Sequence, residues 1–219
     1  MSKRSFNLPE TASVATKGAG AKLYAPSAAR NGEAIVLAMA DFAPKGGKAL
    51  EIASGTGEHM MRFGAAFPDL MWQPTDVAPE RIASIDAWRQ TAALPNIKPA
   101  VILDACTAGW ALSHKGQNLI FLSNMLHLIS DTAAKTVLSE AALALTAGGV
   151  LALYGPFMRG EDFASEGDRR FHESLRAQDV EIGYKSIDWV QTWQESVGLK
   201  VFDPIEMPAN NLILVARKP

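Results

Sequence analysis

The amino-acid sequence predicts an α/β fold in which a mostly parallel sheet is covered by helices on both faces. Short apolar segments alternate with helical segments of roughly 10–15 residues between residues 27 and 154, which is typical of βαβ units. The segment 118–123 is almost wholly apolar, as expected of a strand buried on both sides. The sequence contains no repeat and no second core, so we predict one domain over residues 23–219.

The N-terminal half predicts three strands that each end at a turn or an acidic residue. Residues 1–22 are polar and small without a period, so we predict a flexible lead-in. A helix over residues 27–42 ends before Pro44, and the helix after the first strand ends at Pro68. The three strands are residues 49–53, 70–75 and 98–103, and a helix over residues 79–92 separates the last two.

The C-terminal half predicts four more strands. The fourth is 118–123, and Asp131 is a suitable N-cap for the helix that follows. We expect this helix to close at Gly148-Gly149, before a strand over residues 150–154. The alternation then stops, and residues 155–185 are predicted to form a lid-like insertion.

The chain closes with a helix and a strand pair. Ser165 is a candidate cap for a helix inside the insertion, and Ser186 for one that ends at Gly198. Five residues separate the strands 199–206 and 212–216, which is short enough for a hairpin. The last strand is therefore predicted to be antiparallel to its neighbour, in a sheet of seven strands.

Composition excludes several classes of protein. The chain has 219 residues, a formal net charge of −2 and one cysteine, Cys106. The charge gives no basic face for nucleic acid or an anionic membrane. One cysteine permits no internal disulfide, and we interpret it as a small hydrophobic residue; we predict no metal.

No signal peptide or apolar run of about 18 residues is present, so we expect a cytoplasmic location. The sequence predicts no particular oligomeric state.

The segment Leu50–His59 carries most of the chemical information. Its Gly-rich turn, Ser54-Gly-Thr-Gly57, joins a strand to a helix and lets a ligand approach the backbone closely. Asp76 ends the next strand, where a carboxylate can bind both hydroxyls of a ribose. Asp104 ends the third strand at the same edge. These positions predict a cofactor that contains a nucleoside.

The residues around the turn favour S-adenosylmethionine over a dinucleotide. A dinucleotide fingerprint needs a third glycine where this chain has Met60. Glu51, inside the strand before the turn, suits a cationic amino group rather than a phosphate. S-adenosylmethionine supplies both a ribose and an α-ammonium group, so a nicotinamide-dependent oxidoreductase is the less favoured alternative.

The motif Glu51-x-Ala-x-Gly-x-Gly57, with Asp76 and Asp104, resembles the Rossmann-like S-adenosylmethionine-dependent methyltransferases. The resemblance implies that the first acid and the turn line the methionine moiety, the second acid holds the ribose and the third region borders the adenine. The product would be S-adenosylhomocysteine. Ala53 stands where these proteins usually have glycine. The implied cofactor-binding residues are Glu51, Ala53, Ser54, Gly55, Thr56, Gly57, Asp76, Asp104, Ala105 and Asn124.

A closer resemblance covers nearly the whole chain from Tyr24 onward. Six segments together resemble the family of methyltransferase-like protein 26, and they raise the expectation for fold and cofactor more than for substrate. The segments are Tyr24–Asn31, Glu51–His59, Trp72–Asp76, Ser123–His127, Tyr154–Phe157 and Glu206–Asn211.

A substrate is expected at the carboxyl ends of the parallel strands. His127 follows the fourth strand and is a candidate general base, or alternatively a wall of the pocket. Asn210 and Asn211 could orient a polar substrate, or could form a turn because asparagine tolerates left-handed backbone. Aromatic residues of the insertion could form a lid or only pack. The candidate substrate-pocket residues are Tyr24, Arg30, Asn31, Tyr154, Phe157, Asn210 and Asn211.

The expected activity is methylation of a small-molecule acceptor by direct in-line transfer. The sulfonium is already activated, so the protein must mainly align the reactants and exclude water. A lidded pocket without a basic groove favours a small molecule over DNA, RNA or a folded protein. The alternative is a non-catalytic adaptor or sensor that keeps the cofactor pocket.

Overall fold

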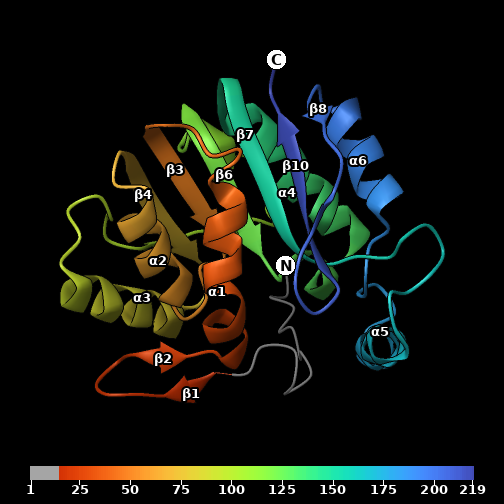
Figure 1. The fold of residues 1–219 in the computed structure, drawn as a ribbon, viewed down its shortest axis with the longest axis horizontal. Helices are drawn as coiled ribbons and strands as arrows, with labels where there is room; N and C mark the ends of the chain where they lie inside the picture. The colour runs from red at the N-terminus through yellow and green to blue at the C-terminus, as the bar shows by residue number, and fades with distance from the viewer. Residues whose placement is uncertain (1–14) are drawn as a thin grey trace.

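The computed structural model describes residues 15–219, and Figure 1 shows a central twisted sheet with helices on both sides. The helices are α1 (Pro26–Met39), α2 (Glu58–Ala66), α3 (Pro79–Ala92), α4 (Asp131–Ala144), α5 (Glu166–Gln178) and α6 (Ile187–Ser196). Short 3-10 helices span Trp110–Leu112 and Leu126–Leu128. The strands are β1 (Thr16–Lys17), β2 (Leu23–Tyr24), β3 (Gly47–Ile52), β4 (Leu70–Asp76), β5 (Val101–Ile102), β6 (Gln117–Ser123), β7 (Leu145–Pro156), β8 (Lys200–Val201), β9 (Ile205–Glu206) and β10 (Asn211–Arg217).

The main sheet has the order β5-β4-β3-β6-β7-β10-β8, and β9 also pairs with β10. Neighbours from β5 to β7 are parallel, whereas β10 is antiparallel to β7, β8 and β9. The strands after β3 are added on one side of it and β6 lies on its other side, so the strand order reverses between β3 and β6. In such sheets a ligand is expected at the carboxyl ends of the two strands that flank this point. The predicted mostly parallel sheet with an antiparallel last strand is confirmed.

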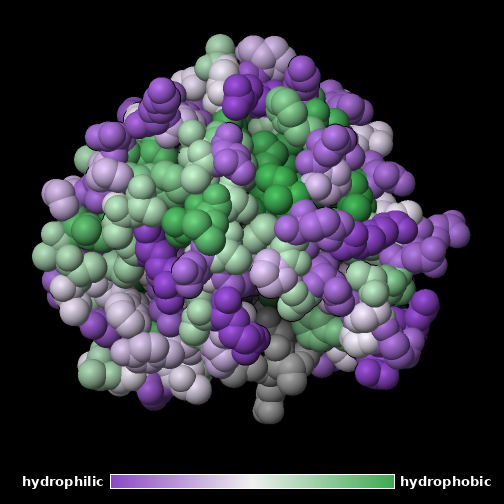
Figure 2. All heavy atoms as spheres, viewed as in Figure 1, coloured by the Kyte–Doolittle hydropathy of each residue, from purple (hydrophilic) through white to green (hydrophobic). Residues whose placement is uncertain are grey.

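Two apolar layers hold the helices against the sheet. On one face, α1 and α2 bury Ile35, Met39, Met60 and Phe63 against the strands. On the other face, α4 and α6 pack against β6, β7 and β10. In Figure 1, α1 and α2 lie in front of the sheet and α4 behind it. On the front face, hydrophilic and hydrophobic residues are interspersed (Figure 2).

Three predicted strands differ in extent from the observed ones, and proline explains two of them. The expected strand 98–103 is reduced to Val101–Ile102, next to Pro99. The expected strand 199–206 is divided into β8 and β9 around Pro204. Proline has no N–H to donate to a ladder, so it interrupts a strand at these points. The fifth predicted strand, 150–154, is longer than expected and begins at Leu145.

The boundary between α4 and β7 also differs from the prediction. Ser130, rather than Asp131, caps α4, and its hydroxyl accepts a hydrogen bond from the N–H of Ala133 at 3.2 Å. The helix ends at Ala144, and Gly148-Gly149 lie inside β7, where the register with β6 shifts. The glycine pair therefore belongs to a strand irregularity, not to a helix end.

An N-terminal hairpin occupies part of the segment predicted to be a flexible lead-in. β1 and β2 pair antiparallel, and the N–H of Leu23 donates to the Ser84 hydroxyl of α3 at 2.8 Å. Trp88 of α3 donates its ring N–H to the carbonyl of Leu23 at 3.0 Å. Residues 16–22 therefore lie in a hairpin docked on α3, whereas residues 1–14 lie outside the described part of the chain.

Candidate functional site

The turn between β3 and α2 lies at the carboxyl edge of the sheet, where the strand order reverses between β3 and β6. Three of its residues have left-handed backbone: Ala53 (φ 53°), Gly55 (φ 60°) and Gly57 (φ 94°). The N–H of Ser54 donates to the carbonyl of Thr75 at 2.7 Å, which ties the turn to β4. Gly57 is the N-cap of α2, so the free N–H groups of the first helical turn face this edge.

Glu51 is a buried acid with one unpartnered carboxylate oxygen. It is 1% exposed, and within residues 15–219 its Oε2 atom has no hydrogen-bond partner. Burial raises the pKa of this carboxyl to about 7, although a hydrogen bond with Ser54 acts in the opposite direction and the charge of Asp76 adds to the rise. A buried charge is stable only when paired. The position is therefore suited to a ligand cation.

Asp76 holds the turn in place from the end of β4. Its Oδ2 accepts the N–H of Gly55 at 2.9 Å, and its Oδ1 accepts the N–H of Ala78 at 3.0 Å. Burial raises its pKa, and these backbone hydrogen bonds oppose the rise. Each carboxylate oxygen has a second lone pair, so the group can still accept hydrogen bonds from two hydroxyls.

The remaining predicted cofactor residues lie at the same edge but in different environments. Asp104 is exposed, and its carboxylate accepts the N–H of Cys106 (3.0 Å) and the hydroxyl of Thr107 (2.9 Å), so it organises its own loop. Ala105 is buried in the core. Asn124 has left-handed backbone (φ 52°) and donates its N–H to the carbonyl of Tyr154 at 2.9 Å. Burial and Asp104 raise the pKa of the Cys106 thiol to about 11.

The predicted substrate residues divide between the two faces of the sheet. Asn31 (8% exposed) and Tyr154 (2%) are buried on the α1 face, whereas Phe157 packs in the core of the α4 face. Tyr24, exposed in β2, stacks edge-on against Trp88 with ring centroids 5.0 Å apart. The structure therefore brings Asn31 and Tyr154 together but separates them from Phe157.

His59 is a polar residue of this site to which the sequence analysis gave no role. It lies in the first turn of α2, is buried, and its Nε2 is 2.7 Å from Oδ1 of Asn31. Its Nδ1 is 3.4 Å from the Ser123 hydroxyl at the end of β6. The available signal was its position directly after the Gly-rich turn, where α2 begins at the carboxyl edge of the sheet.

His127 is buried under the insertion. Its ring lies 5.8 Å from the ring of Phe171 and 5.9 Å from that of Tyr184, both measured between centroids. Burial and the charge of Lys185 lower its pKa to about 3, so the ring is neutral at physiological pH. The base role of His127 stays a prediction.

Asn210, just before β10, and Asn211, its first residue, both bond to protein groups. Asn210 donates its amide to Asp168 of α5 at 3.0 Å, and Asp168 also accepts the hydroxyl of Tyr184 at 3.1 Å. Asn211 donates to the carbonyls of Pro208 and Ala209, both at 3.2 Å. Asn210 has left-handed backbone (φ 60°), as the turn interpretation expects. Asn210 therefore connects this loop to the insertion.

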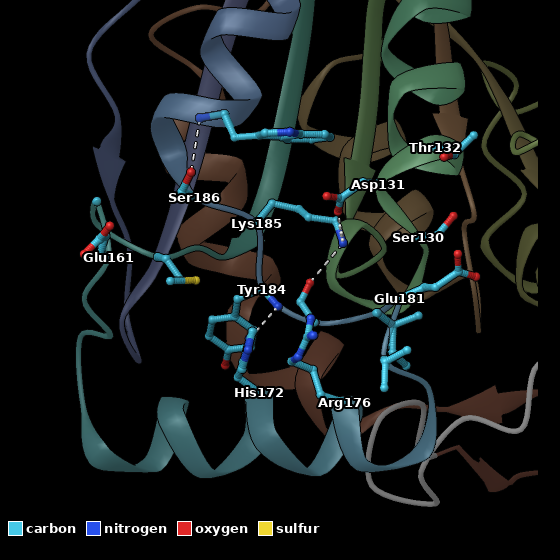
Figure 3. Close-up of a pocket in the computed structure, with 16 residues that line it drawn as sticks. Ser130, Asp131, Thr132, Glu161, His172, Arg176, Glu181, Tyr184, Lys185 and Ser186 are labelled. Carbon is cyan, nitrogen blue, oxygen red and sulfur yellow. Dashed lines mark hydrogen bonds and ion pairs between the residues drawn. The ribbon is translucent and has the colours of Figure 1, made fainter.

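A pocket of about 560 Å³ lies between α5 and the start of α4, separate from the Gly-rich turn (Figure 3). Lys185, which is 6% exposed, extends along it and donates to the carbonyls of Ile129 (2.9 Å) and Gly183 (3.3 Å). It also pairs with Asp131 at 2.9 Å. The three ammonium hydrogens are thus engaged with protein oxygens, and Lys185 fastens the insertion to α4.

Within the described residues, no helix is long and apolar enough to cross a membrane. No group of three His, Cys, Asp or Glu side chains in residues 15–219 is placed to hold a metal ion.

The strand order and the Gly-rich turn after β3 define the Rossmann-like methyltransferase fold, and solved structures support this assignment. The mitomycin 7-O-methyltransferase superposes with a TM-score of 0.74 at 16% identity, over 88% of this chain and 54% of that one. An O-methyltransferase family protein from Burkholderia thailandensis gives 0.72 at 15% identity, over 85% and 55%. Human N-acetylserotonin methyltransferase gives 0.68 at 16% identity, over 88% and 52%. The chain thus spans about half the length of these proteins.

The chain belongs to the family described as "Protein of unknown function (DUF938)", whose family model matches residues 22–218.

Proposed function

We propose that the protein is an S-adenosylmethionine-dependent methyltransferase that acts on a small-molecule acceptor. The observation that carries the proposal is the buried carboxylate of Glu51, whose Oε2 has no hydrogen-bond partner within residues 15–219, beside a Gly-rich turn and a second acid, Asp76. A cationic amino group satisfies the first acid, and a ribose satisfies the second. The residues present therefore fit this cofactor.

Each group would have a separate task. Glu51 would pair with the α-ammonium, the backbone of the turn would face the amino-acid end, and Asp76 would accept the ribose hydroxyls. Asp104, Ala105 and Asn124 would border the adenine. Bound S-adenosylmethionine would supply an electrophilic methyl group, which the acceptor's lone pair attacks in line with the breaking C–S bond. The insertion would exclude water, and His127 is the candidate base for an acceptor that is not already ionised.

The structural neighbours are consistent with this proposal. Human N-acetylserotonin methyltransferase was solved in complex with S-adenosylmethionine, and the calicheamicin methyltransferase CalO1 with S-adenosylhomocysteine bound. We also propose the closer kinship with the family of methyltransferase-like protein 26, on the six segments named above. The balanced charge and the single cysteine support a cytoplasmic location.

Calorimetry with two ligands tests the cofactor. We expect S-adenosylhomocysteine to bind with a stoichiometry of one per chain and NADH to give no saturable heat. Tighter binding of NADH would overturn the proposal in favour of an oxidoreductase. Transfer of labelled methyl groups to a panel of small acids, phenols, amines and thiols then tests catalysis. Cofactor binding without transfer to any of them would favour an adaptor or sensor.

A pair of aspartate variants tests the assignment of the ribose site. Asp76→Asn should weaken S-adenosylhomocysteine binding by about 10- to 100-fold, because the amide offers one acceptor oxygen in place of two charged ones. Asp86→Asn is the matched control and should leave the affinity unchanged, since Asp86 lies in α3 outside the proposed site and bonds to Arg89 and to the N–H of Ala100. Calorimetry measures both affinities. Equal losses in the two variants would contradict the assignment.

A further inference from the structure

Two side chains hold both the N-terminal hairpin (β1 and β2) and the Gly-rich turn. The Ser84 hydroxyl accepts the N–H of Leu23 at 2.8 Å and donates its hydrogen to the carbonyl of Thr56 at 2.7 Å. The Oε2 atom of Glu58 accepts the N–H of Ala25 at 2.5 Å and the hydroxyl of Thr56 at 3.0 Å. Each side chain therefore links a backbone N–H at or just after the hairpin to the same residue of the turn.

Thr56 is the residue through which both bridges act on the proposed cofactor site. It lies between two glycines with left-handed backbone and is 4% exposed. Asp76 holds the N–H of the glycine before it, whereas Ser84 and Glu58 hold the carbonyl and the hydroxyl of Thr56 itself. The conformation of the turn therefore depends on the two bridges as well as on Asp76.

The hairpin is a small element that depends on its docking contacts. Its two strands have two residues each, most of residues 16–22 are exposed, and it lies against the ends of α1 and α3 in Figure 1. Trp88 of α3 donates its ring N–H to the carbonyl of Leu23, and its ring contacts Tyr24 and Lys22. Because an isolated two-stranded hairpin is marginal in water, these contacts decide between a docked and an undocked state.

The two hydrogen bonds of Ser84 depend on each other. Its hydroxyl has one hydrogen, which goes to the turn, and a lone pair that receives the N–H of Leu23. A hydroxyl that donates is polarised into a better acceptor, and both bonds are stronger away from water. Ser84 is 0% exposed while the hairpin is docked. Undocking would admit water to Ser84 and weaken its bond to Thr56.

We propose that Ser84 and Glu58 are positioning residues that couple docking of the N-terminal hairpin to binding of the cofactor at the Gly-rich turn. This inference rests on the proposed function. A docked hairpin holds Thr56 in the arrangement that the cofactor meets, and a bound cofactor holds the same arrangement for the hairpin. Each event therefore raises the affinity of the other by the same factor. The hairpin acts as a strap that tightens when the cofactor binds.

Amide hydrogen exchange in the wild-type protein measures this coupling. We expect saturating S-adenosylhomocysteine to slow exchange at Leu23 and Ala25 by about 5- to 100-fold, the usual range of coupling factors. The N–H of Trp189 is the matched control, because it also donates to a serine hydroxyl, that of Ser186, but packs on the opposite face of the sheet. Its exchange should not change.

Two outcomes of this measurement would overturn the inference while the cofactor still binds. One is unchanged exchange at Leu23 and Ala25. The other is equal slowing at Trp189, which would show general stabilisation of the fold rather than coupling to the hairpin. If the wild-type protein bound no S-adenosylhomocysteine at all, the proposed function would have failed, and this inference with it.

Trp88→Phe tests the coupling from the side of the hairpin. Trp88 bonds to Leu23 and, among residues 15–219, has no hydrogen bond to the turn. Its loss should loosen the hairpin and weaken S-adenosylhomocysteine binding about threefold or more in calorimetry. Trp193→Phe removes the same type of ring N–H bond, to the carbonyl of Lys135, and should leave the affinity unchanged. Faster exchange at Leu23 with full affinity in Trp88→Phe would contradict the coupling.

The double variant Ser84→Ala with Trp88→Phe tests whether Ser84 carries the coupling. Once the Ser84 bridge is gone, Trp88→Phe should weaken S-adenosylhomocysteine binding less than it does in the wild-type background. Additive losses of affinity would show that the two residues act independently and would overturn the role of Ser84. The exchange measurement on the wild-type protein decides the inference even where a variant does not fold.

Discussion

Glu51→Gln is expected to weaken S-adenosylhomocysteine binding by about a hundredfold and to stabilise the ligand-free protein at pH 8. The loss of affinity follows because the proposed partner of Glu51 is an α-ammonium, and removing one member of a buried charge pair costs about 3 kcal/mol. The gain in stability follows because burial penalises the charged form of Glu51, whose Oε2 has no hydrogen-bond partner in residues 15–219. The same residue thus costs folding energy and supplies binding energy.

The stability effect has a defined dependence on pH. The pKa of Glu51 is about 7 in the folded protein against 4.5 in the reference state. Between these values the folded state binds the extra proton, so the stability of the wild type falls as pH rises from about 4.5 to about 7. The glutamine side chain of the Glu51→Gln variant resembles the protonated carboxyl and does not titrate. The advantage of this variant should grow from near zero at pH 4.5 to about 3 kcal/mol at pH 8.

Urea denaturation at several pH values, with calorimetry on the same samples, measures both effects. Wild-type affinity for S-adenosylhomocysteine should rise about tenfold per pH unit up to pH 7, because binding needs the ionised carboxylate. Glu140→Gln is the matched control: Glu140 is also buried, but its carboxylate accepts the N–H of Ala111 at 2.8 Å. That variant should gain no stability at any pH. Equal responses of the two variants would show that Glu51 is not a binding residue.

The fold and the geometry of the turn after β3 were largely predictable because local signals there agree with tertiary structure. The strands 49–53 and 70–75 were predicted from short apolar runs, and both end where the chain must turn. Glycines at a βα turn and an acid after the next strand follow from ligand approach and from hydrogen bonding. Gly55 and Asp76 are directly connected, through the N–H of Gly55.

Long-range contacts explain what the sequence did not predict. His59 gains its role from Asn31, 28 positions away, and Asn210 gains its partner from Asp168, 42 positions away. Neither contact leaves a local pattern. The separation of Tyr154 from Phe157 did have a signal: Phe157 directly follows β7, and residues three apart along an extended chain point to opposite faces. The start of β7 at Leu145 depends on its pairing with β6. No local pattern in residues 145–149 predicts this pairing.

Gly57→Ala is expected to unfold the protein readily, whereas Gly55→Ala should fold and lose the cofactor. A Cβ on Gly57 would lie 2.8 Å from the Cα of Ile85, so the backbone of α3 would have to move, and the φ of 94° adds strain. The expected loss is about 3 kcal/mol of stability. At Gly55 a Cβ would meet only the carbonyl of Ala53, at 4.0 Å, so strain at φ 60° is the main cost, about 1 to 2 kcal/mol.

The Cβ of Gly55→Ala would therefore project into space that no described residue fills, which is where the proposed cofactor must approach the turn. We expect S-adenosylhomocysteine affinity to fall more than tenfold in calorimetry, with a urea midpoint lowered only by this strain. Gly20→Ala is the matched control, because Gly20 has a similar φ of 65° in the N-terminal hairpin and nothing within 4 Å. It should show the same strain and full affinity. Full affinity in Gly55→Ala as well would mean that the ligand does not approach the turn, and the proposed site would have to move elsewhere along the sheet edge.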